Sequence, residues 1–159
     1  VYVSDRVQQT VYVYDAKGAY QRAFEPSRAA LGGGWQPLGL AFDGQGHLYV
    51  TDVSGPSHRV LAFERDGTLL RTFRSAGPFS FPNAVAVDRW GNVYVSDSNN
   101  GRLVIVDFEK EPGKSRDWVL NHVRAGKATV TAEVLAAGFE LEREEKILKE
   151  NYVLVFRRP

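Results

Sequence analysis

The stretch Gly101-Arg-Leu-Val-Ile-Val-Asp-Phe108 decides how this sequence of 159 residues folds, because two different patterns meet in it. Toward the N-terminus, it matches the third strand of a unit that occurs twice earlier in the chain. Toward the C-terminus, it is the first strand of a strand, helix, helix, strand, strand segment that is not repeated. If Leu103–Val106 pairs with Tyr152–Phe156 as well as with its own unit, the repeated sheet continues into the tail.

A repeat with a period near 45 residues organises the chain before this stretch. Val1–Asp5, Leu48–Asp52 and Val93–Asp97 share the pattern apolar-Tyr-Val-Ser/Thr-Asp and are spaced by 47 and 45 residues. Their period-2 alternation and β-branched residues predict strands that each end at an Asp suited to a turn. Further strands are predicted around these three, at Pro37–Asp43, Pro82–Asp88, Val11–Asp15, Arg59–Phe63, Arg102–Val106, Ala19–Phe24 and Thr68–Phe73.

Four short antiparallel strands per unit are typical of a β-propeller blade. The pattern Pro-x-x-apolar-Ala-apolar-Asp-x-x-Gly-(His/Asn)-apolar-Tyr-Val-(Ser/Thr)-Asp, which contains Gly46-His-Leu48, resembles the NHL repeat over about residues 1–106. The resemblance implies a binding module. Since propellers typically close with about four to eight blades, we expect an incomplete NHL-type β-propeller with two to three four-stranded antiparallel blades. The expected fold class is mainly β with a small α/β tail.

The tail after Phe108 departs from the repeat and predicts two helices and two strands. Ser115 is the expected N-cap of the first helix and Gly126 its end. The second helix, about residues 128–137, is expected to bury Val130, Val134 and Leu135 and to stop at Gly138 in a left-handed conformation. Two strands follow, Phe139–Arg143 with one exposed face, and Tyr152–Phe156, whose unbroken apolar run predicts burial on both faces.

From Gly101 to Pro159 the chain resembles the C-terminal end of a class I S-adenosylmethionine-dependent methyltransferase. The matching stretches are Gly101-Arg-Leu-Val-Ile-Val-Asp-Phe108, Ala132-Glu-Val-Leu-Ala-Ala-Gly-Phe139 and Asn151-Tyr-Val-Leu-Val-Phe-Arg-Arg-Pro159. The resemblance implies that the last strand inserts antiparallel between the other two. It also implies a cofactor site on a Gly-rich turn after the first strand of the family's sheet, but blades occupy that part of this chain, so no cofactor is expected.

Composition excludes several classes of function. Residues 1–100 carry nine Lys and Arg against nine Asp and Glu, and residues 101–159 carry eleven against ten, so neither half favours nucleic acid. The chain has no Cys and no paired-His spacing, which argues against a transition-metal site. No apolar run approaches the roughly 20 residues of a membrane span, and no secretory signal pattern appears. We therefore expect a soluble protein of unknown compartment.

The candidate ligand-binding residues are the charged side chains that recur at the strand ends. Asp5, Asp52 and Asp97 close the three equivalent strands, and Arg59 and Arg102 open the strands that follow. These five would line one rim of a propeller and bind a cation or a polar ligand. The alternative is that the carboxylates cap turns through hydrogen bonds to the backbone. No catalytic constellation is evident, and the three histidines, His47, His58 and His122, are interpreted as structural.

These patterns predict two domains and leave three functional interpretations open. The domains are residues 1–100, the blades, and residues 101–159, the methyltransferase-like segment, which share the strand at 102–108. The first interpretation is a non-catalytic binding or scaffold module for a protein or glycan. The second is a methyltransferase of which only the end is present, and the third is a fragment or chimera. Because the first blade lacks a neighbour, open blade edges also predict self-association.

Overall fold

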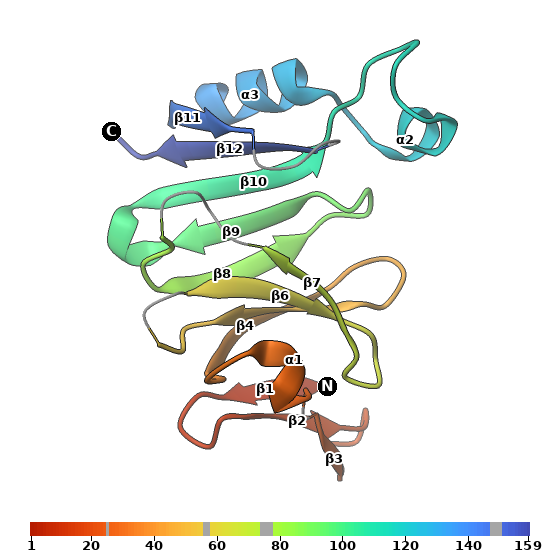
Figure 1. Cartoon of the computed structure of the whole chain (residues 1–159), viewed down its shortest axis with the longest axis vertical. Coiled ribbons are helices and arrows are strands. Elements are labelled where there is room, and N and C mark those ends of the chain that lie inside the picture. The colour runs from red at the N-terminus through yellow and green to blue at the C-terminus, as the bar shows by residue number, and fades with distance from the viewer. Residues whose placement is uncertain (25, 56–57, 74–77, 147–150) are drawn as a thin grey trace.

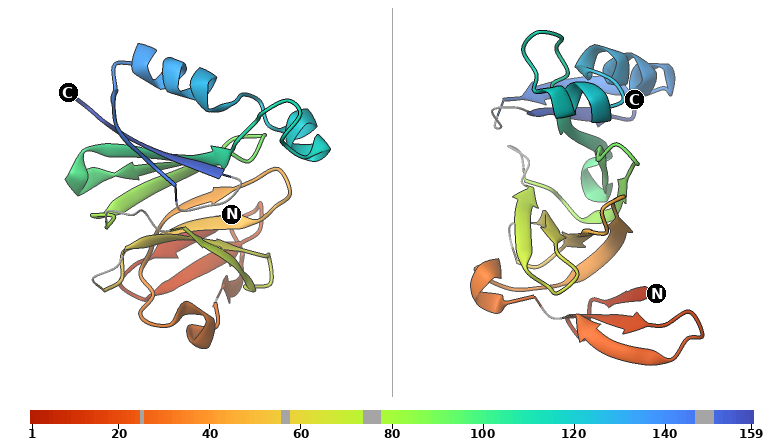
Figure 2. Two further views of the ribbon diagram at one scale, coloured as in Figure 1. Left: turned by 45° about the horizontal axis from the view of Figure 1, so that its top comes forward. Right: turned by 90° about the vertical axis from the view of Figure 1, so that its right-hand side faces the viewer.

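The described residues form three antiparallel sheets stacked along the long axis, and helix α3 (Lys127–Ala136) lies over the last of them (Figures 1 and 2). The computed structural model describes residues 1–24, 26–55, 58–73, 78–146 and 151–159. The expected fold class, mainly β with a small α/β tail, is confirmed. The three sheets follow one another in sequence order from the N-terminus upward in Figure 1.

The first sheet, called blade 1, contains three strands in the described residues, β1 (Tyr2–Asp5), β2 (Thr10–Tyr14) and β3 (Tyr20–Phe24). The second sheet, blade 2, has the complete set of four, β4 (Pro37–Phe42), β5 (Leu48–Asp52), β6 (Arg59–Phe63) and β7 (Leu69–Phe73). The short helix α1 (Arg28–Leu31) lies in the connection between the two blades. Neighbouring strands in each blade are antiparallel.

The third sheet joins the repeat to the tail. It contains β8 (Pro82–Val87), β9 (Val93–Asp97), β10 (Arg102–Phe108), β11 (Glu140–Glu145) and β12 (Asn151–Arg157) in the order β11-β12-β10-β9-β8. A single 3-10 turn, η1 (Ser98–Asn100), connects β9 to β10. Leu103 lies opposite Ser96 on one edge of β10 and opposite Phe156 on the other, so the predicted double pairing of this strand is confirmed.

Strand β12 completes the blade that the local sequence leaves unfinished. In blades 1 and 2, the outermost strand (β3 or β7) follows the strand before it (β2 or β6) through a tight turn and pairs with it antiparallel. In the third sheet the chain makes a long excursion after Phe108, and β12 then takes that position beside β10. We therefore call β8, β9, β10 and β12 blade 3. Because β12 lies antiparallel between β10 and β11, the strand order implied by the tail's resemblance is confirmed.

Three hydrophobic clusters separate the layers. The first lies between blades 1 and 2 and is built on the buried residues Val11, Phe24, Leu31, Trp35, Leu48, Val50, Leu61 and Phe63. The second lies between blades 2 and 3 and the third lies between blade 3 and α3 (Lys127–Ala136). Val153 and Val155 of β12 belong to the second cluster, whereas Tyr152, Leu154 and Phe156 belong to the third. The predicted burial of this strand on both faces is therefore confirmed.

The two predicted boundaries of the first helix are wrong. Helix α2 (Asp117–His122) has Arg116, not Ser115, as its N-cap, because the Ser115 hydroxyl bonds to the Glu109 carbonyl at 2.6 Å within the preceding turn. Helix α2 ends at His122, and Gly126 instead precedes α3 as its N-cap.

The second helix is predicted well except for one side chain. Val130 is 2% exposed and Gly138 has a φ of 90°, as expected for a left-handed helix stop. Leu135 is 46% exposed, so its predicted burial is wrong. At about 100° per residue, Leu135 is turned away from the face on which Val130 and Val134 meet the sheet. No helix in the described part of the chain is long and apolar enough to cross a membrane.

Candidate functional site

The strand-end carboxylate of blade 2 is fully buried and fully engaged. Asp52 is 0% exposed, and its Oδ1 accepts hydrogen bonds from the backbone N–H of Gln36 at 2.9 Å and of Ser54 at 3.0 Å. Its Oδ2 accepts a hydrogen bond from Arg59 Nε at 2.9 Å. A buried carboxylate is tolerated only when paired and hydrogen-bonded in this way. Asp52 therefore fixes the end of β5 to the linker before β4.

Arg59 extends this arrangement across the inter-blade linker. Its guanidinium also donates to the Leu31 carbonyl at 2.7 Å and to the Gly34 carbonyl at 3.1 Å. The residue is 8% exposed. Its planar fork of donors suits three acceptors at once. The structure thus brings Asp52 and Arg59 together as a buried ion pair that holds the turn after α1 against blade 2.

Blade 3 uses the same two repeat positions differently. Asp97 is 2% exposed and accepts hydrogen bonds from Ser80 N–H and from Asn100 Nδ2, both at 2.6 Å. Arg102 forms a two-pronged ion pair with Glu142 of β11, with Nε–Oε2 and Nη2–Oε1 distances of 2.5 Å. Hydrogen bonding to Glu142 raises the pKa of Arg102 above its ordinary value. This arginine therefore joins blade 3 to the tail.

Asp5 of blade 1 lies apart from the other candidates. Its Oδ1 accepts from the backbone N–H of Val7 at 2.9 Å and of Gln8 at 2.8 Å, so it caps the turn between β1 and β2. The position that Arg59 and Arg102 hold in the later blades is occupied by Thr10, which pairs opposite Asp5. Of the five candidates, only Asp52 and Arg59 bind each other, whereas Asp5, Asp97 and Arg102 each contact other residues.

A second polar cluster in blade 2 lies in the turns at the strand ends opposite Asp52 and Arg59. His47 Nδ1 lies 2.8 Å from Asp43 Oδ2, and its Nε2 lies 3.7 Å from Glu64 Oε1. Partial burial raises the pKa of Asp43, but hydrogen bonds from His47 and from the Gln45 backbone outweigh it and hold the pKa below its usual value. His47 therefore closes the turn between β4 and β5, in keeping with a structural histidine.

The corresponding residues of blade 3 are more deeply buried. Asn92 donates from Nδ2 to Asp88 Oδ2 at 2.6 Å, while its own buried Oδ1 lacks a hydrogen-bond partner among the described residues. Asp107, equivalent to Glu64 by register, accepts from Tyr152 Oη at 3.2 Å and from the Phe108 backbone at 2.6 Å. Burial raises the pKa of Asp107 to about 6. This carboxyl lies at the contact between β10 and β12.

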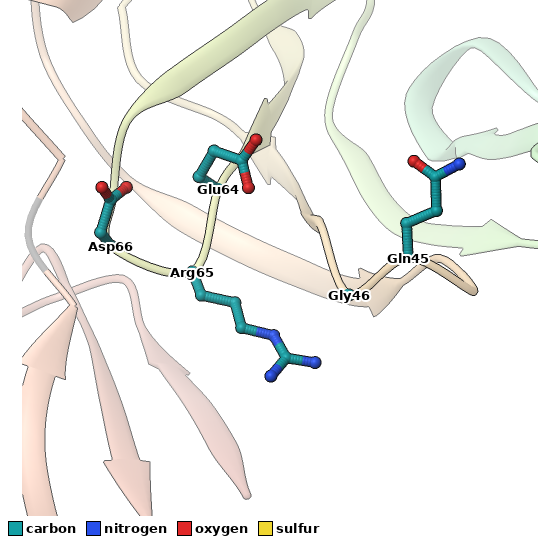
Figure 3. Close-up of a pocket in the computed structure, with 5 residues that line it drawn as sticks. All are labelled: Gln45, Gly46, Glu64, Arg65 and Asp66. Atoms are coloured by element: carbon teal, nitrogen blue, oxygen red, sulfur yellow. The ribbon is translucent and has the colours of Figure 1, made fainter.

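A shallow hollow of about 320 Å³ lies between two turns of blade 2 (Figure 3). Gln45 and Gly46 come from the turn between β4 and β5, and Glu64, Arg65 and Asp66 come from the turn between β6 and β7. The Arg65 guanidinium lies close over Gly46, where a Cβ would be 2.5 Å from Nη2. Among the described residues, no group of three or more His, Asp or Glu side chains is placed to hold a metal ion.

Within the described residues, one face of blade 1 is exposed, and this face carries a cluster of tyrosines. Rings of Tyr12 and Tyr14 lie edge-on to Tyr20, with centroids 6.4 and 6.0 Å away. Val3 on the same face is 45% exposed and Tyr20 is 58% exposed. We call Val1, Val3, Tyr12, Tyr14 and Tyr20 the free face of blade 1. The tyrosines were not among the predicted site residues, although the period-2 alternation of the strands places Val3, Tyr12 and Tyr14 on one face.

The equivalent positions of the free face are buried in the other two blades. By strand register, Val3 and Tyr12 correspond to Val50 and Leu61 of blade 2, and both of those are 0% exposed beneath blade 1. The equivalent pair in blade 3, Val95 and Val104, is 1% and 2% exposed beneath blade 2. The free face of blade 1 therefore has the position of a surface that the other two blades bury.

Comparison with known proteins supports the repeat and the fold. The model of the NHL repeat matches residues 35–63 and 79–106, which run from the linker before the first strand of blades 2 and 3 to their third strands. The predicted resemblance is thus confirmed in these two blades. For residues 1–34 it stays a prediction. No curated protein sequence matches the chain.

Two crystal structures of virginiamycin B lyase from Staphylococcus aureus are similar in fold. The selenomethionine-substituted enzyme matches with a TM-score of 0.50 and 14% identity, over 71% of this chain and 38% of that chain. A catalytically inactive variant with quinupristin matches with a TM-score of 0.49 and 15% identity, over the same shares. This chain thus spans 38% of the lyase's length. The first match supports a propeller-like arrangement of blades, and no comparison supports the methyltransferase resemblance.

Proposed function

We propose that the chain is a non-catalytic binding or scaffold module of the NHL-type β-propeller for a protein partner, and that residues 1–159 by themselves associate through the free face of blade 1. The match of the NHL repeat to blades 2 and 3 carries the proposed module. The exposure of the free face within residues 1–159, at positions that blades 2 and 3 bury against a neighbouring blade, carries the association. Exposed apolar surface rimmed by polar groups is typical of protein interaction sites. A glycan, the other partner considered, would also stack on tyrosines, but the aliphatic Val1 and Val3 favour a protein.

The strand-end charges have a supporting role in this proposal. Asp52, Asp97 and Arg59 are buried and held by intramolecular hydrogen bonds. Binding an external ligand through them would first break these bonds, each of which costs roughly 1–3 kcal/mol when a buried partner is left unsatisfied. Their proposed role is to fix the blades rigidly, so that the free face and the turns keep a defined shape.

Self-association is the first measurable consequence. Sedimentation velocity of the chain at micromolar concentration is expected to give species larger than the 17.7 kDa monomer. Val3→Glu should shift the distribution toward monomer, because a carboxylate would have to be desolvated in the contact. Leu70→Glu is the matched control, since Leu70 of β7 is 46% exposed, as Val3 is 45% exposed, but lies outside the free face. A stable monomer, or equal effects of both substitutions, would refute the proposal.

The division into domains is proposed on the same structural basis. Residues 1–100 would form the blades and residues 101–159 the methyltransferase-like segment, with β10 shared between them. The continuous sheet β11-β12-β10-β9-β8 supports the sharing. The fragment or chimera interpretation is tested by the nucleotide sequence around residues 95–110 and by the neighbouring genes, where an intact propeller and an intact methyltransferase would support it.

The alternative function is an S-adenosylmethionine-dependent methyltransferase. One observation favours it, the antiparallel position of β12 between β10 and β11. The residues that would have to supply the cofactor turn instead form the blades. Calorimetric titration of the chain with S-adenosylmethionine is expected to give no binding heat, and 1:1 binding at micromolar affinity would support the enzyme over the scaffold. The likeness to virginiamycin B lyase supports the fold only.

A further inference from the structure

The polar turn residues of blade 3 differ from those of blade 2 in the side chain between two carboxylates. In blade 2, the imidazole of His47 fills this place, 2.8 Å from Asp43 and 3.7 Å from Glu64. By strand register, the equivalent residues of blade 3, called here the polar cluster of blade 3, are Asn92, Asp88 and Asp107. The outer atoms of the imidazole have no counterpart in Asn92, because the asparagine side chain is shorter.

Asn92 binds one of the two carboxylates and leaves one of its own atoms unpaired. Its Nδ2 donates to Asp88 Oδ2 at 2.6 Å. Its Oδ1 is on the same carbon as Nδ2 and therefore lies in the same cluster, yet it accepts no hydrogen bond from the described residues. Asn92 is 0% exposed. An unsatisfied acceptor at this depth is costly, so a donor or a cation beside it would stabilise the fold.

Asp107 lacks the backbone partners that its equivalent has in blade 1. There, Asp15 Oδ1 accepts from two backbone N–H groups of the tight turn between β2 and β3. In blade 3 the tail replaces this turn. Among the described residues, Asp107 accepts only from the Phe108 N–H and from Tyr152 Oη, and it is 2% exposed. A carboxylate that caps a turn elsewhere in the repeat is thus buried here without a turn to cap.

The charges of the two aspartates are only partly compensated. Besides burial, the charge of Asp88 raises the pKa of Asp107, so the two carboxylates repel each other. The charge of Arg124 lowers the same pKa, but its guanidinium is paired with Glu133 at the surface. The cluster thus combines two carboxylates with an unpaired amide oxygen. Such a set of oxygen atoms with two negative charges suits Ca²⁺.

We propose that the polar cluster of blade 3 binds a Ca²⁺ ion, with Asp88 and Asp107 as carboxylate ligands and Asn92 Oδ1 as a carbonyl ligand. Water would supply the remaining ligands, since Ca²⁺ takes about six to eight oxygens. The ion would connect the turn between β8 and β9 to the end of β10, the strand that the blades share with the tail. This site goes beyond the proposed scaffold function and uses no residue of the free face.

Calorimetric titration of the metal-depleted chain with calcium chloride at about pH 7.5, where aspartates are ionised, tests the site. We expect one ion to bind per chain. Asp107→Asn should weaken binding about tenfold or more, because one of the two carboxylate charges is lost. Glu64→Gln is the matched control, because it removes the carboxylate at the same repeat position in blade 2. It should change the affinity by less than about twofold, since its half-exposed charge is screened from the site.

Asn92→His tests the ligand set without removing a charge. The imidazole would take the place that His47 holds in blade 2, so the turn should still close but Ca²⁺ binding should be lost. Nuclear magnetic resonance locates the ion in the wild type. Ca²⁺ should shift the signals of the Asn92 side-chain amide and the Phe108 backbone amide, which bond directly to the two aspartates. The Gln45 backbone amide, in the equivalent turn of blade 2, should not shift.

Thermal unfolding gives an independent readout and shows whether each variant folds. Because a ligand that binds only the native state stabilises it, Ca²⁺ should raise the Tm of the wild type and of Glu64→Gln. It should leave the Tm of Asn92→His unchanged. Cooperative unfolding of Asn92→His would exclude misfolding as the reason for its lost binding.

Three results would overturn the proposal. The first is no heat of binding and no rise in Tm at about 10 mM Ca²⁺, a concentration that saturates even weak calcium sites. The second is an equal loss of affinity in Asp107→Asn and Glu64→Gln, which would indicate non-specific binding to surface carboxylates. The third is full Ca²⁺ affinity in a folded Asn92→His. Unchanged Ca²⁺ binding in Val3→Glu would separate this site from the association through the free face.

Discussion

Blades 2 and 3 carry an Asp and an Arg at equivalent strand ends, yet the two pairs have different surroundings. In blade 2, Asp52 and Arg59 are buried against each other and against the linker that precedes the blade. In blade 3, Asp97 caps a turn with Asn100, and Arg102 turns outward to Glu142 of the tail. The repeat thus determines the backbone position of a charged residue, whereas segments outside the repeat determine the partner of its side chain.

The largest expected effect is the loss of one partner of the buried pair. Asp52→Ala leaves the Arg59 guanidinium buried without its counter-charge, so we expect the free energy of unfolding to fall by about 3–5 kcal/mol. Asp97→Ala should cost less, about 1–2 kcal/mol, because neutral donors are left unpaired. Urea unfolding followed by circular dichroism measures both.

If Asp52→Ala proves too unstable to measure, the double substitution Asp52→Ala with Arg59→Leu tests the same point. Removing both charges takes away the uncompensated cation, so the double variant should be more stable than Asp52→Ala alone. Equal losses at Asp52 and Asp97 would contradict the distinction drawn between the two blades.

A smaller and pH-dependent effect is expected at Asp107, where blade 3 meets β12. Burial raises the pKa of this carboxyl to about 6 from an ordinary value of 3.8, and the charge of Asp88 also raises it. A raised folded-state pKa means that the neutral form stabilises the fold below about pH 4 and that this contribution is lost as pH rises through 6. The buried charge is therefore a cost at neutral pH.

Asp107→Asn removes this titration while keeping an oxygen that can accept from Tyr152 Oη. Relative to the wild type, the variant should gain about 2–3 kcal/mol of stability between pH 4 and pH 7.5, from the difference between the folded and unfolded pKa values. Unfolding curves at several pH values measure the difference. The same scan on Asp88→Asn, which removes the nearby charge that raises this pKa, should move the pH-dependent loss of stability to lower pH rather than abolish it. A pH-independent difference between Asp107→Asn and the wild type would show that Asp107 titrates normally.

The helix that covers blade 3 depends on its stop signal. Gly138 has a φ of 90°, so Gly138→Ala should destabilise the tail by about 1 kcal/mol. Gly138→Asn should cost less, because Asn tolerates the left-handed region better than Ala. A Cβ at this position meets nothing within 4 Å, so the loss would come from the backbone alone. Identical thermal unfolding of all three proteins would place the end of the helix elsewhere.

Most of the architecture was predictable because it rests on local periodicity and on a repeat. The unbroken apolar run of Tyr152–Phe156 predicts a central strand, and Gly138 predicts a helix stop, without any knowledge of partners. The N-cap was not predictable in the same way. Ser115 and Arg116 both precede the helix, and a hydrogen bond to the Glu109 carbonyl, six residues earlier, decides between them.

Less of the candidate site than of the fold could be predicted from the sequence. Recurrence identified Asp52 and Asp97 as equivalent, but it carried no information on Glu142, which lies 40 residues beyond Arg102 in an unrelated segment. The tyrosines of blade 1 were visible in the sequence at positions that blades 2 and 3 fill with Leu, Phe or Val. Whether such a face is covered depends on long-range packing, so only the three-dimensional arrangement separates it from an interior surface.

The smallest expected effect is at Arg102, which holds the position in blade 3 that Arg59 holds in blade 2. The Arg102–Glu142 pair lies on the surface, with side-chain exposures of 29% and 25%, and surface ion pairs contribute about 0–1 kcal/mol. Arg102→Gln should therefore cost at most about 1 kcal/mol, and raising the salt concentration to about 1 M, where charges are screened beyond roughly 3 Å, should abolish the difference from the wild type. Arg59→Gln should remain strongly destabilising at the same salt concentration, because Asp52 is then left buried without its cation and solvent ions do not reach it. If salt removed both effects or neither, the two arginines would have equivalent environments. The contact of Arg102 with Glu142 of the tail would then not distinguish it from Arg59.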